Sequence, residues 1–119
     1  MEKLTKTEEP VMKIIWNLKK VFVKDIIRNL PDPKPPYNTV SSIVRILESK
    51  KMVGYESFGR THRYFPLVSQ SVYKSKMIGF LVNDYFGGST TSLLSYIVAE
   101  SELNNEETEE LKNFIKEKL

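Results

Sequence analysis

The 119-residue sequence contains no cysteine and only one histidine, His62. Without cysteine there is no disulfide framework, no thiolate metal site and no cysteine nucleophile, and one histidine cannot form a multi-histidine metal site. The sequence also lacks a Gly-rich phosphate loop and the His-Glu-x-x-His and Gly-x-Ser-x-Gly patterns. Acidic pairs such as Glu106-Glu107 lie at predicted helix starts, where they suit the helix dipole. We therefore expect no enzyme, no catalytic residue, no metal and no cofactor.

Long apolar runs are absent too. No stretch approaches the roughly 20 residues that a membrane-spanning helix needs, and the N-terminus lacks the apolar segment of a signal peptide. We expect a cytoplasmic protein with no membrane insertion, large enough for one domain or a small domain with an appendage.

Charge is distributed unevenly along the chain. Residues 1–68 hold 13 Lys and Arg against 7 Asp and Glu, a net charge of +6, whereas residues 69–119 hold 5 against 8, a net charge of −3. All four arginines lie in the first part. This imbalance favours a polyanionic partner for the first part, and its alternative is chance in a small protein.

The stretch from Tyr37 to Lys50 predicts a helix with two different faces. Its apolar residues recur with helical spacing, at Val40, Ile43, Val44 and Leu47. The opposite face carries short polar groups and one arginine, at Asn38, Ser42, Arg45 and Ser49. Such groups can enter a DNA major groove and donate hydrogen bonds to bases. We interpret this stretch as a recognition helix, with an ordinary solvated face as the alternative.

Two other helical patterns precede it. Leu4 to Lys20 predicts a first helix with a core residue at Trp16. Its start is capped either by Thr5, paired with Glu8 in a capping box, or by Thr7, which would place Pro10 in the first turn. Phe22 to Leu30 predicts a second helix, and the proline-rich stretch 31–36 predicts a stiff connector that sets the angle to the next helix. A proline-rich ligand for another domain is the alternative for that stretch.

After Lys50 the apolar period changes from 3.6 to 2. Residues 53–58 and 61–65 predict two strands of a hairpin that turns at Gly59-Arg60. Three helices followed by a hairpin is the element order of a winged helix, whose hairpin lies along the DNA backbone or minor groove. We therefore place Arg60 and Arg63 against phosphates, with a solvated hairpin edge as the alternative. We interpret His62 as a surface or cross-strand residue.

The remaining sequence predicts three amphipathic helices, at 69–86, at 89–100 and from Asn104 or Asn105 onward. Together they carry more apolar surface than they can bury alone, so we interpret them as a dimerisation element, with folding back onto the N-terminal domain as the alternative. The predicted fold is mainly α with a small β-hairpin: a winged helix-turn-helix DNA-binding domain at 1–68 and a helical dimerisation region at 69–119. The predicted dimerisation residues are Tyr73, Met77, Phe80, Leu81, Tyr85, Leu93, Leu94, Ile97, Val98, Leu111, Phe114 and Ile115.

These patterns favour a winged-helix protein that binds DNA as a dimer, because an operator with two half-sites calls for two copies of the recognition helix. The predicted DNA contacts are Tyr37, Asn38, Thr39, Ser41, Ser42, Arg45, Arg60 and Arg63. Asn38, Ser42 and Arg45 would face base edges with Ser41 beside them, and the others would hold the DNA backbone. The alternative is a winged-helix module that binds another protein without specific DNA binding.

A family resemblance extends over nearly the whole chain. It is carried by a series of short motifs in order: Leu4-Thr5 with Glu8, Ile15-Trp16, Leu30-Pro31, Tyr37-Asn38-Thr39-Val40, Leu47-Glu48-Ser49-Lys50, Gly59-Arg60 with Tyr64, Pro66-Leu67-Val68, Phe86-Gly87-Gly88, and Glu102-Leu103 ahead of Glu106-Glu107. The series resembles the BlaI/MecI/CopY family of bacterial repressors. The resemblance implies a winged-helix homodimer that binds a palindromic operator and acts as a repressor of transcription. It maps the recognition helix onto 38–50, the wing onto 53–65 and the dimerisation helices onto 69–119.

The sequence departs from that family at three places. Copper-responsive members end in a cysteine cluster, which is missing here. The resemblance to β-lactam-responsive members implies a membrane-bound sensor peptidase as a partner in the same pathway, but their Asn-Phe cleavage pair aligns with Ser95-Tyr96-Ile97, and the Asn113-Phe114 pair falls in another helix. Finally, many members have a second basic residue after the position of Arg45, where this chain has Ile46.

Overall fold

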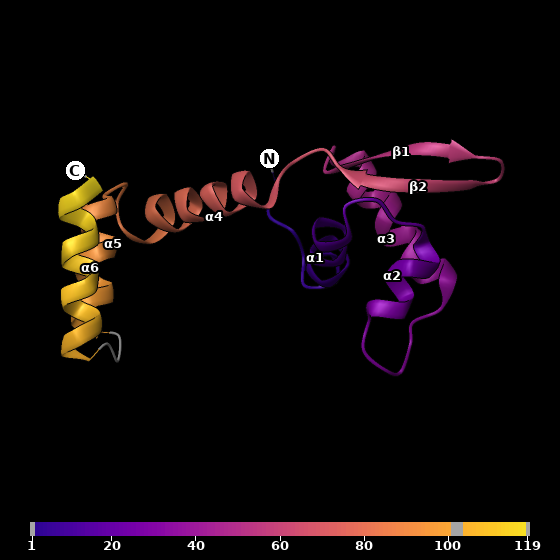
Figure 1. Cartoon of the computed structure of the whole chain (residues 1–119). Coiled ribbons are helices and arrows are strands. Elements are labelled where there is room, and N and C mark those ends of the chain that lie inside the picture. Colours follow the sequence, from indigo (N-terminus) through magenta and orange to yellow (C-terminus); the bar gives the residue numbers. More distant parts are fainter. Residues whose placement is uncertain (1, 101–103, 119) are drawn as a thin grey trace. The chain divides into compact units, whose positions relative to one another are not determined.

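The structure, a computed structural model, describes residues 2–100 and 104–118, with the side chains of residues 115 and 118 outside the described part. The chain divides into two units, Met1–Met77 and Ile78–Leu119. The elements in chain order are α1 (Glu8–Leu18), α2 (Val23–Asn29), α3 (Tyr37–Ser49), β1 (Val53–Phe58), β2 (Thr61–Pro66), α4 (Gln70–Tyr85), α5 (Thr90–Glu100) and α6 (Asn105–Lys118) (Figure 1).

The first unit has the winged-helix order of three helices and a hairpin. Strands β1 and β2 pair antiparallel with Tyr55 opposite Tyr64, and Gly59 takes a positive φ of 62° in the turn. Val21, between α1 and α2, forms an isolated antiparallel bridge with β2, because its N–H and C=O both bond to Tyr64. Figure 1 shows the hairpin extending beyond the three helices of this unit. The predicted fold class, mainly α with a small β-hairpin, is confirmed.

One hydrophobic core joins these elements. The apolar stripe predicted for α3 is confirmed, since Val40, Val44 and Leu47 are fully buried. Apolar stripes buried against one another supply most of the stabilisation of such a unit. The buried cluster consists of Leu4, Val11, Met12, Ile15, Val21, Val23, Ile26, Leu30, Val40, Val44, Leu47, Met52, Val53, Tyr64 and Tyr73.

Helix α1 is shorter than predicted at both ends. It begins at Glu8, after Thr7 as the N-terminal cap residue, so Pro10 lies in the first turn, where its missing N–H needs no intrahelical acceptor. The reciprocal pair of the capping box is also present: Glu8 N–H donates to Thr5 Oγ1 at 3.2 Å, and Thr5 N–H donates to Glu8 Oε1 at 3.0 Å. The helix ends where Lys19 adopts a φ of 73°.

The proline-rich connector at 31–36 is neither helix nor strand, as predicted. Lys34 connects this stretch to the end of α2. Its ammonium group donates to the Arg28 carbonyl at 3.0 Å and to the Leu30 carbonyl, at the C-terminal end of α2. A cation there satisfies backbone acceptors and complements the negative end of the helix dipole. Helix α3 begins directly after Pro36.

The units divide inside α4, later than the predicted boundary after residue 68. Tyr73 explains this position, because it is buried and its hydroxyl accepts a hydrogen bond from Leu4 N–H at 2.9 Å. The Tyr73 ring lies 5.4 Å from the ring of Trp16, whose Nε1–H donates to the Val68 carbonyl at 2.8 Å. The first turns of α4 are thus part of the first unit, and the core position predicted for Trp16 is confirmed.

Polar caps mark the later helices. Ser69 accepts from Val72 N–H before α4, Ser89 accepts from Ser92 N–H before α5, and Asn104 accepts from Glu107 N–H before α6. Gly87 and Gly88, both with positive φ, separate α4 from α5. None of the helices in the described residues is both long and apolar enough to cross a membrane.

Candidate nucleic-acid interface

Helix α3 exposes the polar face that its sequence predicts. Asn38, Ser42 and Arg45 are exposed on the side opposite the buried stripe. Ser49 is exposed as well, but its hydroxyl donates to the Ile46 carbonyl at 2.7 Å and is therefore not available as a donor to a ligand. The first three turns of α3 offer the polar groups that can reach another molecule.

A groove of about 430 Å³ lies between α3, the start of α2 and the hairpin. Tyr37, Ser41 and Arg45 are spaced four residues apart and form the wall on α3. The full set of lining residues is Phe22, Val23, Lys24, Tyr37, Ser41, Arg45, Glu48, Tyr55, Arg60, Thr61, His62 and Tyr64. Three basic side chains face one acidic side chain in this groove, so it favours an anionic ligand.

Aromatic rings form the hairpin wall of the groove. His62 stacks on Tyr55 with ring centroids 4.1 Å apart and an interplanar angle of 10°, which agrees with its interpretation as a cross-strand residue. Tyr64 is buried behind them, and burial, together with the nearby charge of Glu48, raises the pKa of its phenol. The hairpin residues that line the groove include no acidic side chain.

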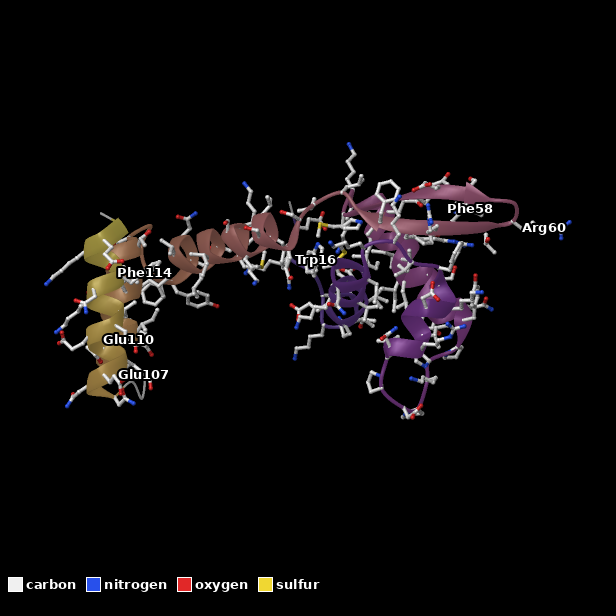
Figure 2. The ribbon with its side chains drawn as sticks, in the orientation of Figure 1. Trp16, Phe58, Arg60, Glu107, Glu110 and Phe114 are labelled. Carbon is white, nitrogen blue, oxygen red and sulfur yellow. The ribbon has the colours of Figure 1, made fainter. Side chains whose placement is uncertain are left out.

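The four arginines divide into two pairs. Arg28 lies 3.6 Å from Asp25, and Arg63 lies 3.2 Å from Glu56 with its guanidinium 4.7 Å from the ring centre of Phe58. Arg45 and Arg60 line the groove, and neither makes an ion pair within the described part of the chain. Figure 2 shows Arg60 at the tip of the hairpin, pointing away from the strands. Among the described residues, the groove therefore holds the two guanidinium groups that make no ion pair with a carboxylate.

Arg63 lies on the face of the hairpin opposite to Tyr64, away from the groove. Glu56 and Arg63 are paired across the strands, and Lys20 lies 3.4 Å from the same carboxylate. The hydrogen bond from Arg63 is the main cause that lowers the pKa of Glu56. Arg63 Nε is buried and has no hydrogen-bond partner among the described residues. The structure therefore does not bring Arg63 into the groove with Arg45 and Arg60.

Of the predicted DNA contacts, Tyr37, Ser41, Arg45 and Arg60 line the groove. Asn38, Thr39 and Ser42 are exposed on α3 outside it. Lys24, an exposed residue of α2, also lines the groove and was not among the predicted DNA contacts. No pattern in the sequence separates Lys24 from the other lysines of residues 1–68.

The predicted dimerisation residues lie in different environments. Tyr73 is buried and Met77 half-buried, and both pack against the core of the first unit. In the second unit Leu93 is buried, Phe80, Leu94, Ile97 and Leu111 are half-buried, and Leu81, Tyr85, Val98 and Phe114 are exposed. The side chain of Ile115 lies outside the described part. Ile78 and Tyr96 are exposed apolar residues outside the predicted set.

The described residues contain no group of three or more His, Cys, Asp or Glu side chains placed to hold a metal ion. The acidic residues of α6, such as Glu107 and Glu110, are exposed along that helix (Figure 2).

Comparison with known proteins gives a match over most of the chain. Residues 4–117 match the family described as penicillinase repressor. The methicillin resistance regulatory protein MecI of Staphylococcus aureus (strain N315) is 27% identical over 116 residues, which cover 97% of this chain and 94% of that protein. The penicillinase repressor of Bacillus licheniformis is 24% identical over 119 residues, covering 96% of this chain and 90% of that protein.

Solved structures show a weaker likeness. The CopR repressor structure is 29% identical with a TM-score of 0.47, and it covers 57% of this chain and 100% of that chain. The structure of BpsR of Bordetella bronchiseptica is 15% identical with a TM-score of 0.49, covering 98% and 75%. The fold assignment rests instead on the element order and packing described above.

Proposed function

The chain belongs to the penicillinase repressor family, whose members are transcriptional repressors and not enzymes, and we propose that it binds a palindromic operator as a homodimer. The observation that carries this proposal is the position of Arg45 and Arg60. They come from α3 and from the hairpin, line one groove, and make no ion pair among the described residues. Two unneutralised guanidinium groups on two sides of a groove favour the phosphates and base edges of duplex DNA.

In this proposal α3 enters the major groove. Arg45 pairs with a guanine and Asn38 with an adenine, because each side chain can make two hydrogen bonds to that base. Each such pair discriminates against a wrong base by about 1–3 kcal/mol. Ser42 reads a base edge from the same face, and Ser41 contacts the edge of the site.

The remaining predicted residues hold the DNA backbone. Tyr37, Thr39 and Arg60 contact phosphates, which set the position of the protein on the duplex without specifying sequence. The exposed position of Lys24 in the groove supports its addition to this set. For Arg63 the ion pair with Glu56 supports a different role, in which it stiffens the hairpin that presents Arg60.

The second unit supplies the dimer contact. Ile78, Leu81 and Tyr85 follow the i, i+3, i+7 spacing on α4 and are all exposed. A stripe of exposed apolar residues favours a protein interface, and a second copy would present the same stripe. Two α3 helices related by a twofold axis would read the two halves of a palindrome. The site of action would be the cytoplasm, and a membrane-bound sensor peptidase stays a prediction from the resemblance.

Fluorescence anisotropy with the protein's own upstream DNA tests the proposal. We expect tight binding at two protomers per site that resists scrambled competitor. Affinity should fall with salt with a log–log slope near −0.9 for each phosphate neutralised. Equal, weak binding to both DNAs would contradict a specific repressor. A dimer that ignores DNA would favour the alternative module that binds another protein.

Arginine variants separate the predicted roles. Arg45→Ala should relax specificity at one base pair in each half-site. Arg60→Ala should weaken operator and scrambled DNA alike and reduce the salt slope by about 0.9 for each of the two protomers. Arg28→Ala is the matched control, because it removes the same charge from an exposed position outside the groove. An equal effect of Arg28→Ala would mean that overall charge, not the groove, binds DNA.

A further inference from the structure

Ile46 is an apolar side chain that neither the core nor the groove of the first unit uses. It is 45% exposed on α3, whereas the core residues Val44 and Leu47 beside it in sequence are fully buried. Tyr37 is the other large exposed apolar residue of α3, but Tyr37 lines the groove and Ile46 does not. The position of Ile46 thus needs another explanation.

Ile46 lies among the residues that are proposed to face bases. It follows Arg45 directly and lies one helical turn after Ser42, and both of these side chains are exposed. Thr39, seven residues earlier, lies on the same flank and is also exposed. The exposed residues around Ile46 on this face are therefore short polar side chains and a guanidinium group, and its apolar neighbour one turn earlier, Ile43, is half-buried and packs against the core.

The major groove of DNA presents one apolar group to such a side chain, the C5-methyl group of thymine. We propose that Ile46 is a specificity-determining residue that packs against the methyl group of a thymine next to the base pair contacted by Arg45. This inference rests on the proposed function, since it requires α3 to lie in the major groove. Each operator half-site should then contain a thymine whose methyl group contributes to binding, in addition to the hydrogen-bonding groups of its base pair.

Deoxyuridine substitution tests this contact directly. Uracil keeps the hydrogen-bonding groups of thymine and lacks only the methyl group, so each thymine of the operator is replaced singly by deoxyuridine, and binding is measured by anisotropy. We expect one thymine in each half-site at which the replacement weakens binding of the unmodified protein about fourfold, the factor that burial of one methyl or methylene group is worth.

Protein variants test whether Ile46 causes the sensitivity to the thymine methyl group. Ile46→Ala should bind the thymine and uracil operators with equal affinity, and Ile46→Val, which keeps an apolar branched side chain, should retain part of the difference. Leu18→Ala is the control, because Leu18 is similarly exposed, at 40%, but lies at the end of α1. This variant should keep the full difference between the two operators.

Two results would overturn the inference, and they have different consequences for the repressor proposal. Specific binding of the operator with no thymine sensitive to uracil, or with the sensitivity unchanged in Ile46→Ala, would remove the role of Ile46 and keep the repressor proposal. Failure of the unmodified protein to prefer its operator over scrambled DNA would remove both.

Discussion

The first unit buries its apolar stripes within itself, whereas the second unit leaves part of its apolar surface exposed. In the first unit the stripes of α1, α2 and α3 and one face of the hairpin share a core. In the second unit Val82 and Leu93 are buried among the described residues, while Tyr85 is 76% exposed. Helical spacing of apolar residues predicts that a face will be covered, but it does not say whether the same chain covers it.

The largest expected effect comes from a matched pair of substitutions, one in the buried stripe of the first unit and one in the exposed stripe of the second. Leu47→Ala empties a fully buried site in α3 and should lower the free energy of unfolding by about 2–5 kcal/mol, through lost burial and the cavity left behind. Urea denaturation followed by the fluorescence of Trp16, the only tryptophan, reports this unit. Leu81→Ala removes the same atoms from a side chain that is 39% exposed on α4.

For Leu81→Ala we expect little loss of stability in the Trp16 transition and a raised dissociation constant of the dimer. Sedimentation at several protein concentrations measures that constant. If Leu81→Ala destabilised the Trp16 transition as strongly as Leu47→Ala and left association unchanged, the exposed stripe would not be a dimer contact.

The next largest effect concerns Glu8, a buried carboxylate that joins α1 to the end of α3. Its side chain accepts two hydrogen bonds from Lys50 Nζ, at 2.8 and 3.0 Å, and one from Thr5 N–H. Burial alone would raise the pKa of Glu8, but the hydrogen bonds from Lys50 and Thr5 outweigh it and hold the pKa below its ordinary value. Hydrogen bonds to charged groups are worth about 1.5–3 kcal/mol, so Glu8→Gln should lose about that much stability at pH 7.

The pH dependence of this loss follows from the direction of the shift. Because the pKa of Glu8 is lower in the folded state, its stabilising contribution is present above the ordinary carboxyl pKa and is lost as pH falls through the lowered value. The difference between the unmodified protein and Glu8→Gln should therefore shrink on acidification. Glu56→Gln is the control, because the pKa of Glu56 is also lowered but its carboxylate is exposed to solvent. A difference for Glu8→Gln that is constant with pH would exclude the charged pair as its cause.

The sequence was sufficient to predict features that depend on neighbouring residues. The two faces of α3 and the turn at Gly59-Arg60 follow from local spacing or local chemistry. For the start of α1 the sequence left two alternatives, a cap at Thr5 paired with Glu8 or a cap at Thr7. The structure contains both the Thr5–Glu8 pair and a helix that begins after Thr7. These features need no knowledge of distant contacts.

The features that the sequence did not predict depend on contacts between residues that are not neighbours in the chain. Tyr73 was assigned to the dimer stripe, but its hydroxyl bonds to Leu4, 69 residues earlier, and no local pattern indicates that contact. Arg63 was placed with Arg60 on the basis of charge, although Arg63 and Tyr64 are adjacent in a strand and must point to opposite faces. Since Tyr64 faces the core, the alternation of the strand was the signal that would have separated the two arginines.

The smallest expected effect compares the ends of two helices, one from each unit. After α3, Lys51 adopts a φ of 62°, and the N–H of Met52 bonds to the Leu47 carbonyl. After α4, Gly87 adopts nearly the same φ of 60°. A residue with a side chain is strained in this left-handed conformation, whereas glycine is not, although glycine loses more conformational freedom on folding. Lys51→Gly should therefore stabilise the protein by about 0.5–1 kcal/mol, and Gly87→Lys should destabilise it by a similar amount. Thermal denaturation followed by circular dichroism measures both variants, and opposite signs are the required result, since a general effect of lysine on the surface would not reverse between the two positions.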